Sequence, residues 1–280
     1  MTKKRKAVIR KPVPITVIIT TKNEEKMIGA CIKRLQDFDE IIVVDSNSAD
    51  STQKIAHAHG ASVFNFIWNG EYPKKRGWCL KHLPLKNDWV FFVDADELMT
   101  QGLIDEIFDR WFKERDKYSG FFIKGQYVLN GKLMQHGLIN NKLCLFHRDH
   151  LKFPVVNDLD CPGMGEIEGH YQPVHKAGYF TSRIGQMHRP LEHHAFYDPH
   201  KWTERHKRYA AWQRCMDRKK AWPKDIRSSR QIAKEVVRAL PPMVRGIAMF
   251  LHSYVYKRGF MDGEAGYVLA KSRFDYYTHY

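Results

Sequence analysis

The sequence predicts an α/β protein built on a mostly parallel sheet, with helices on its faces and a helical C-terminal extension. Three runs of mainly apolar, β-branched or aromatic residues, at 15–21, 40–45 and 89–94, each end at a polar turn. Such runs are typical of strands buried on both faces of a parallel sheet. Helical stretches separate them, and this alternation is typical of βαβ units with right-handed crossovers.

The first hundred residues supply these strands and the helices between them. Apolar residues between positions 27 and 35 recur at helical spacing after the first strand. A second helix over 50–59 ends at Gly60, a residue type favoured just past a helix end. A short strand follows at 61–66. Parallel sheets bind ligands at the carboxyl ends of their strands, so the turns after these strands are candidate sites.

The pattern changes beyond residue 100. Thr100 is placed to cap an amphipathic helix. Residues 120–135 predict a hairpin, because Asn130-Gly131 is a strong signal for a type I′ turn, and 142–146 predict a further strand.

The last part of the chain divides into a loop-rich and a helical segment. Residues 149–199 are rich in Gly, Pro and His and predict irregular structure that carries active-site loops. Residues 200–240 and 244–257 predict helices, separated by Pro241-Pro242.

Composition places the chain among ordinary globular proteins. Its 280 residues are 43% hydrophobic and 28% charged, which excludes disordered, collagen-like and coiled-coil classes. The five cysteines are scattered and include no Cys-x-x-Cys pair, so we expect no disulfide framework, no zinc ribbon and a reducing compartment. No apolar run reaches the roughly 18 residues of a membrane span, and the basic start lacks a cleavage site. We therefore expect a cytoplasmic protein.

The formal net charge of +15 is concentrated in two segments. Residues 1–11 carry six Lys or Arg and no acid, whereas residues 201–238 carry thirteen Lys or Arg and four acids. Because Trp and Tyr are interleaved with these charges, the second segment suits nucleic acid or an anionic membrane surface. A solvated helix face explains such a run equally well.

The sharpest chemical signal is VFFVDADE, residues 90–97. Asp94 and Asp96 follow a buried strand and project to the same side. Their oxygens suit Mg²⁺ or Mn²⁺, which also bind phosphates. The alternative is a helix start with acidic first-turn residues, but the buried strand favours the metal. TTKNEE (20–25) and VVDSNSAD (43–50) follow two other strands, and neither a GxGxxG nor a P-loop motif is present.

Four motifs in order resemble a known family. The segments ITVIITTKNEEKMIGACI, EIIVVDSNSADST, YPKKRGWCL and WVFFVDADE resemble the nucleotide-binding half of the family 2 glycosyltransferases, which have the Rossmann-like GT-A fold. The resemblance covers residues 14–100 and implies inverting transfer from a nucleotide-activated sugar. It implies a catalytic domain (14–199) with a nucleotide-binding half (14–100) and an acceptor half (101–199). The charge and helical pattern add a basic tail (1–13) and a basic helical extension (200–280).

The resemblance also implies roles for individual residues. Asp45 would accept a hydrogen bond from the base, and Asp94 and Asp96 would hold Mn²⁺ or Mg²⁺ on the diphosphate. Ser46 is a departure, because many members carry a second acid there. The residues expected to bind the nucleotide are Thr21, Lys22, Glu24, Asp45, Lys75, Arg76 and Asp94.

Inverting transfer needs a carboxylate that takes the proton from the acceptor hydroxyl. The acids available in NDLDCPGMGEIEGHYQP are Asp158, Asp160, Glu166 and Glu168. We favour Glu166 and Glu168, because they share a strand-like face in a constrained segment; a solvent-facing loop acid is the alternative for each. We also expect His188, with His193 and His194 nearby, to add a metal ligand, the alternative being a surface or core histidine.

The distal segments RHKRYAAWQ (205–213) and 250–270 resemble bacterial members that build lipopolysaccharide core or exopolysaccharide. We therefore expect a nucleotide-sugar donor, UDP first and GDP second, and a glycan or lipid-linked acceptor.

The same segments bear on location. We expect a position at the inner face of the plasma membrane, peripheral to its anionic surface. The helix at 244–257 either lies on the bilayer or packs on the catalytic domain through Ile247, Phe250, Leu251 and Tyr254.

Two other functions remain open. A sugar-phosphate nucleotidyltransferase would have a Gly-rich basic loop after the first strand, whereas TTKNEE is acidic and has no glycine. A nucleic-acid-binding protein is suggested by charge alone, and we expect no nucleic-acid partner.

Overall fold

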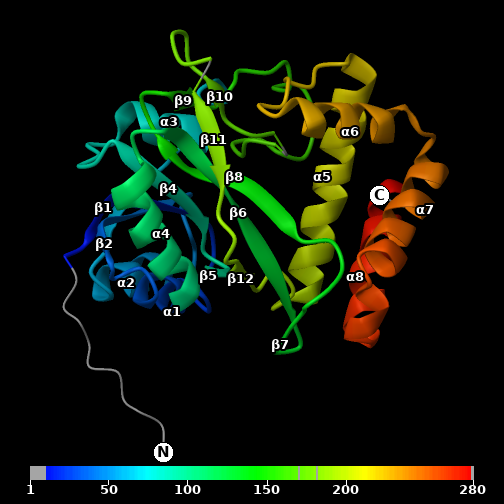
Figure 1. The fold of residues 1–280 in the computed structure, drawn as a ribbon, viewed down its shortest axis with the longest axis horizontal. Coiled ribbons are helices and arrows are strands. Elements are labelled where there is room, and N and C mark those ends of the chain that lie inside the picture. Colours follow the sequence, from blue (N-terminus) through cyan, green and yellow to red (C-terminus); the bar gives the residue numbers. More distant parts are fainter. Residues whose placement is uncertain (1–10, 170, 181, 279–280) are drawn as a thin grey trace, which may run out of the picture.

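A computed structural model describes residues 11–169, 171–180 and 182–278. Most of the expected basic tail, residues 1–13, therefore lies outside the described residues. The described chain forms a ten-stranded mixed sheet in the order β3-β2-β1-β4-β8-β6-β12-β5, with β7 and β11 also paired to β6. Helices flank the sheet, and a group of helices follows it (Figure 1). The predicted α/β class with a helical C-terminal extension is confirmed.

The first half of the sheet is parallel, as predicted. Its strands are β1 (Val13–Thr21), β2 (Phe38–Asp45), β3 (Ser62–Asn65) and β4 (Trp89–Asp94), and its helices are α1 (Ile28–Lys33), α2 (Thr52–Ala58) and α3 (Lys75–His82). The register pairs Thr21 with Asp45 and Thr20 with Asp94. The carboxyl ends of β1, β2 and β4 therefore meet at one edge.

The second half of the sheet adds antiparallel strands. Its elements are β5 (Glu97–Leu98), α4 (Gln101–Glu114), β6 (Tyr118–Leu129), β7 (Lys132–Leu133), β8 (Asn140–His147), β11 (Arg183–Gln186) and β12 (Leu191–His193), with a separate pair β9 (Leu151–Lys152) and β10 (Val174–His175). Thr100 caps α4, as predicted, by accepting from the N–H of Leu103. Asn130 and Gly131 both have positive φ, which confirms the predicted type I′ turn between β6 and β7.

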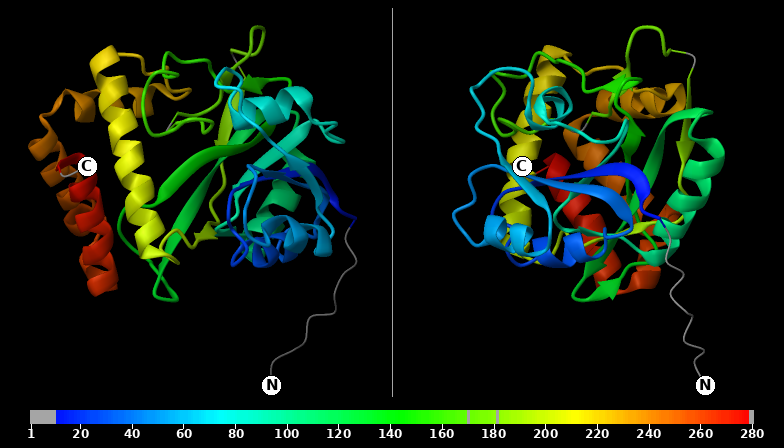
Figure 2. Two further views of the ribbon diagram at one scale, coloured as in Figure 1. Left: turned by 180° about the vertical axis from the view of Figure 1, so that it is seen from behind. Right: turned by 90° about the vertical axis from the view of Figure 1, so that its left-hand side faces the viewer.

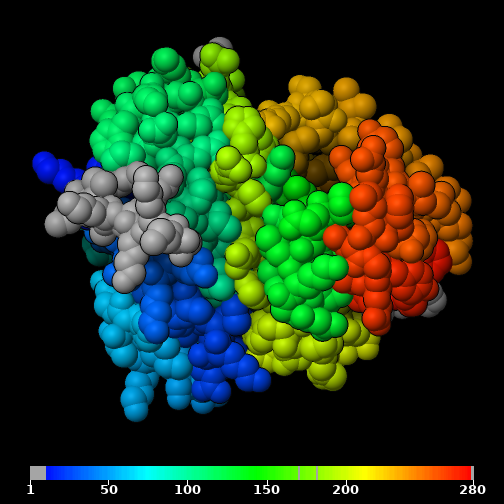
Figure 3. Space-filling view, turned by 60° about the horizontal axis from the view of Figure 1, so that its bottom comes forward, coloured from blue at the N-terminus to red at the C-terminus, as the bar shows by residue number. Residues whose placement is uncertain are grey.

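The C-terminal extension is helical: α5 (Pro199–Lys219), α6 (Ser228–Ala239), α7 (Pro242–Leu251), a π-helical turn (His252–Tyr256), a 3₁₀ turn (Gly259–Asp262) and α8 (Glu264–Thr278). Figures 1 and 2 show α5 between the sheet on one side and α7 with α8 on the other. In Figure 3 these last helices, orange to red, form one side of the molecule beside the green β6–β7 region. Among the described residues, no helix has the length and apolarity that crossing a membrane requires.

The cysteine prediction is wrong in one respect. Cys161 and Cys215 form a disulfide across a separation of 54 residues, while Cys31, Cys79 and Cys144 are free and buried. The sequence spacing gave no sign of the pair, because the fold itself packs the loop around Cys161 against α5. The cysteine pattern therefore no longer supports a reducing compartment.

Candidate active site

The candidate site lies where the chain reverses direction across the sheet. From β1 the chain crosses to β2 on one side, and β4 pairs with β1 on the other. Such a switch point opens a crevice at the carboxyl ends of the strands. Thr21, Asp45 and Asp94 end the three strands that meet there. The sequence prediction of a site at this edge is consistent with the topology.

Asp94 is held between two cations. Arg76 Nη2 lies 2.9 Å from Oδ1 and Lys142 Nζ lies 2.7 Å from Oδ2. Lys142 also lies 2.6 Å from Oε1 of the fully buried Glu97, whose other oxygen accepts from the N–H of Asp94. Burial favours the neutral acid, but Lys142 and Arg76 outweigh burial and hold the pKa of Asp94 well below its usual range. Asp94 is therefore an anion with both oxygens paired.

Asp96 has a different environment. Its side chain is almost fully buried, and Oδ2 accepts no hydrogen bond from any described residue. His193 Nε2 lies 3.7 Å from Oδ1, and Arg205 Nη1 lies 3.7 Å from Oδ2. The His193 ring stacks on Tyr127, with centroids 5.0 Å apart. A buried carboxylate oxygen without a hydrogen bond is costly, so this geometry suits a ligand that supplies positive charge.

The donors around Asp96 fit a divalent cation. Carboxylate oxygen and imidazole nitrogen are ligands of Mn²⁺, and carboxylate oxygen is a ligand of Mg²⁺. No group of three or more His, Cys, Asp or Glu with metal-binding geometry occurs in the part of the chain that the structure describes. Mg²⁺ is usually held in proteins by one or two carboxylates together with water and substrate phosphates. Asp96 and His193 are the protein ligands that this arrangement would use.

His188 is not brought to this pair. Its ring Nδ1 lies 3.0 Å from Glu106 Oε1 of α4, and its side chain is exposed. His193 occupies the position beside Asp96 instead, because β12 pairs with β5 and sets His193 opposite Glu97. The sequence contained His193 only as one of three nearby histidines, and β12 is too short for alternation to mark it.

The two favoured acids, Glu166 and Glu168, lie in a later loop that contacts the start of α3. Glu168 is buried, and its carboxylate accepts from the N–H groups of Arg76 (3.0 Å) and Gly77 (2.8 Å). Burial raises the pKa of Glu168 against the opposing charge of Arg76. Anionic oxygens are stabilised at a helix N-terminus, so Glu168 anchors the turn that presents Lys75 and Arg76.

Glu166 is more accessible. Ser46 Oγ donates to Oε1 (2.5 Å), and Lys75 Nζ lies 2.7 Å from the same oxygen. No described residue hydrogen-bonds its second oxygen, and about a fifth of the side chain is exposed (21%). Ser46, the departure from the family pattern, thus contacts a predicted site acid.

The expected nucleoside pocket is partly assembled. Thr21 is buried and its hydroxyl has no hydrogen bond among the described residues, while Asp45 is buried and accepts from Ser48 N (2.7 Å) and Gln53 Nε2 (2.8 Å). Lys22 is exposed.

Glu24, at the same edge, contacts the segment that leads into α5. Tyr197 donates a hydrogen bond of 2.6 Å to its carboxylate. Burial raises the pKa of Glu24 against this hydrogen bond. The turn after β1 therefore meets the segment that leads into α5.

The sequence missed a buried ion pair beside the site. Lys74 Nζ lies 2.7 Å from Oδ2 of Asp158, and both side chains are almost completely buried. Tyr72 donates to Oδ1 (2.8 Å) and Trp212 Nε1 to Oδ2 (2.9 Å). Asp158, one of the four acids considered as bases, therefore has both oxygens occupied. Asp160 is exposed and pairs with Lys219.

Comparison with known proteins gives the family. The model described as glycosyl transferase family 2 matches residues 16–167, more than half of the chain. An uncharacterized glycosyltransferase of Rickettsia typhi is 34% identical over 197 residues, 60% of this chain and 65% of the relative. A lipopolysaccharide core biosynthesis glycosyltransferase of Rhizobium meliloti is 30% identical over 95 residues, 32% of this chain and 34% of that one. The chain thus spans less than two thirds of the length of these relatives.

Solved structures are similar over a smaller part of the chain. Glucosyl-3-phosphoglycerate synthase from Mycobacterium tuberculosis, in complex with Mn²⁺, UDP and glucosyl-3-phosphoglycerate, is 24% identical over 41% of this chain and 44% of that one, with a TM-score of 0.32. The family model covers β1 to β4, the acid pair and the loop up to Ile167. The chain therefore belongs to glycosyl transferase family 2.

Proposed function

We propose that the protein is a metal-dependent inverting glycosyltransferase that moves a sugar from a nucleotide-sugar donor, a UDP-sugar first and a GDP-sugar second, to a hydroxyl of a glycan or lipid-linked acceptor. Membership of the family favours glycosyl transfer over nucleotidyl transfer or nucleic-acid binding. The observation that carries the proposal is Asp96: a buried carboxylate with one oxygen free of hydrogen bonds, next to His193 and at the end of β4.

The charges around Asp96 suit a diphosphate. Arg76, Lys142 and Arg205 all lie within 4 Å of the carboxylates of Asp94 or Asp96. When bound by Asp96 and His193, Mn²⁺ or Mg²⁺ would neutralise charge on the departing nucleoside diphosphate. These three basic side chains are partly buried, and cations in such a site would stabilise the charge that develops on the diphosphate oxygens.

Among the acids, we propose Glu166 as the base and Glu168 as a positioning residue. Both oxygens of Glu168 are already used by the start of α3, whereas one oxygen of Glu166 is available. Glu166 would take the proton from the acceptor hydroxyl as that oxygen attacks the sugar from the face opposite the diphosphate. The match to a lipopolysaccharide core enzyme supports a bacterial surface glycan as the acceptor.

A ligand-binding experiment tests the donor and the metal. We expect UDP with Mn²⁺ to raise the melting temperature of the purified chain more than UDP alone, because a ligand that binds only the folded state stabilises it. Asp96→Asn and His193→Ala should remove the Mn²⁺-dependent increment. Asp109→Asn is the matched control, since Asp109 pairs with Lys113 on the exposed face of α4. Equal shifts with and without Mn²⁺ would reject metal dependence, and no shift with UDP or GDP would reject the donor class.

A kinetic experiment tests the base. Glu166→Gln should lower kcat for transfer by roughly 10²–10⁴-fold and leave the affinity for UDP unchanged. If UDP affinity falls while kcat is retained, Glu166 acts only through Lys75 and is not the base.

A further inference from the structure

In helix α6, two basic residues pair with a buried acid while two aliphatic residues are exposed. Arg230 and Lys234 lie 3.3 and 2.5 Å from the carboxylate of Asp225, whose side chain is fully buried. Ile232 and Val236, one turn apart, are 62% and 60% exposed. A helix that packs on a protein and faces water is expected to have the opposite arrangement.

The next helix, α7, repeats this arrangement. Arg245 is only 8% exposed; it donates to Asp217 at 2.8 Å and to the carbonyl oxygens of Arg238 and Leu240. The residues on the outer side of α7 are aliphatic. Burying an arginine while exposing aliphatic side chains costs free energy in water, so the outer side of α7 is shaped for an apolar environment.

Four exposed aliphatic residues of α7 and the π-helical turn form a row. Val244, Ile247, Leu251 and Val255 are each 47–55% exposed and recur at intervals of three or four residues. We call these four residues the apolar stripe. Their spacing places them on one side of the helix over about three turns. The stripe is therefore a continuous apolar surface.

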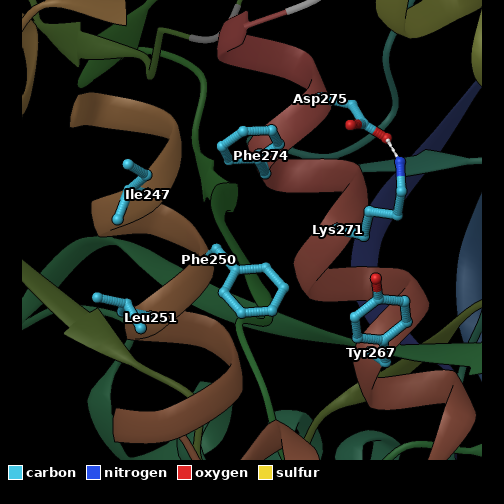
Figure 4. A pocket seen from close by; sticks show the side chains of 7 residues that line it. All are labelled: Ile247, Phe250, Leu251, Tyr267, Lys271, Phe274 and Asp275. Carbon is cyan, nitrogen blue, oxygen red and sulfur yellow. Dashed lines mark hydrogen bonds and ion pairs between the residues drawn. The ribbon is translucent and has the colours of Figure 1, made fainter. Parts of the chain in front are cut away.

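Two hollows open beside the stripe. The first, of about 410 Å³, lies between α7 and α8; Figure 4 shows Ile247, Phe250 and Leu251 on one side of it and Tyr267 and Phe274 on the other. The second is shallow and open to solvent, and is lined by Leu251, His252, Val255 and Tyr256. Leu251 borders both. Lys271 and Asp275, which form an ion pair, also line the first hollow, and its other lining side chains are aliphatic or aromatic. Acyl chains can pack against these apolar side chains.

We propose that the apolar stripe docks on a phospholipid bilayer with anionic headgroups. Lys257 and Arg258 follow the stripe directly and are both exposed, and the whole chain carries a formal net charge of +15. Apolar side chains beside basic ones are what an anionic bilayer surface binds. A second copy of the chain fits less well, because a twofold contact would bring the same basic residues together.

The length of α7 determines how it would lie on the bilayer. The α7 helix has ten residues, so it is about 15 Å long and shorter than the roughly 30 Å hydrocarbon core. It would lie along the interface, with the aliphatic side chains among the acyl chains. This inference does not depend on the proposed donor, metal or base, because none of those residues belongs to the stripe.

Sedimentation with vesicles tests the proposal. The full purified chain, without donor or metal, is mixed with vesicles of phosphatidylcholine alone or of phosphatidylcholine with phosphatidylglycerol. The stripe variant carries Val244→Ser, Ile247→Ser, Leu251→Ser and Val255→Ser. The matched control carries Ile67→Ser and Val155→Ser, which alter equally apolar side chains that are 76% and 75% exposed elsewhere. Circular dichroism checks folding, and Ile247→Ser with Leu251→Ser replaces the stripe variant if the latter is unfolded.

We expect the wild type and the control to sediment with the anionic vesicles and to bind neutral vesicles more weakly. The stripe variant should bind anionic vesicles with a partition coefficient at least about tenfold lower than that of the wild type. A tenfold change corresponds to about 1.4 kcal/mol of binding free energy. Equal sedimentation of wild type and stripe variant overturns the proposal, as does the absence of wild-type binding to either vesicle. A wild-type dimer in gel filtration that the serine substitutions abolish assigns the stripe to a second copy and also overturns it.

Discussion

The parallel half of the sheet and the C-terminal extension distribute apolar and charged side chains in opposite ways. In β1, Ile15, Ile18 and Ile19 are fully buried, and the strand contains no charged residue. In α6 and α7, aliphatic side chains are half exposed, while Arg245 is buried. Whether a region buries or exposes its apolar side chains indicates whether its surface is suited to water or to an apolar partner. The first surrounds a polar crevice, and the second presents an apolar surface.

The largest expected effect is at the joint between these regions, Asp158. Its carboxylate binds Lys74, which directly precedes α3, and Trp212 of α5. Asp158→Asn leaves Lys74 buried without its counter-charge, so the free energy of unfolding in urea should fall by about 3–5 kcal/mol.

A neighbouring acid provides the control. Asp160 pairs with Lys219 at the surface, and Asp160→Asn should change the free energy of unfolding by less than about 0.5 kcal/mol. Similar losses for the two variants would show that the buried ion pair does not join the regions.

The second effect is on catalysis. If Asp96 holds a metal ion as proposed, Asp96→Asn should lower the rate of sugar transfer by roughly 10²–10³-fold, because the charge on the departing diphosphate would no longer be neutralised. Stability should be kept, since Asp96 Oδ2 accepts no hydrogen bond within the described chain. The measurement is donor turnover with Mn²⁺, beside the melting temperature. A turnover within threefold of wild type would remove Asp96 from the site.

The strand ends could be predicted because they depend on local pattern. The apolar run before Asp94 fixes a buried strand, and the parallel order of β1, β2 and β4 brings Thr21, Asp45 and Asp94 to one edge. The pair Asn130-Gly131 likewise predicted a type I′ turn, because that turn requires two residues with positive φ. Each of these features follows from residues within a few positions of one another.

The remaining features depend on contacts distant in sequence. His193 reaches Asp96 through the pairing of β12 with β5, a strand of two residues that no periodicity marks. Lys142 reaches Asp94 from β8, and Ser46 reaches Glu166 across 120 positions. The outward direction of the α7 stripe was also hidden, because helical spacing groups its residues without showing which side is buried.

The third effect concerns the disulfide, which ties the loop before Glu166 to α5. Its 54-residue separation gives an expected loss of about 2–4 kcal/mol when Cys161 and Cys215 are both replaced by Ser. Dithiothreitol should destabilise the wild type by a similar amount and leave the double variant unchanged. A reductant effect of equal size on both proteins would place the sensitivity elsewhere than in this bond.

The smallest expected effects concern two residues of α7, one buried and one on the outer side of the helix. Arg245→Met removes hydrogen bonds to Asp217 and to two carbonyl oxygens, so unfolding in urea should become about 1–3 kcal/mol easier. Ile247→Ser, on the outer side, should change it by less than about 0.5 kcal/mol. An aliphatic side chain that stabilised the isolated protein would instead cost 2 kcal/mol or more on truncation, as is common in cores. A loss of unfolding free energy of that size for Ile247→Ser would mean that the apolar stripe packs within the protein. The two regions would then not differ in how they bury their apolar side chains.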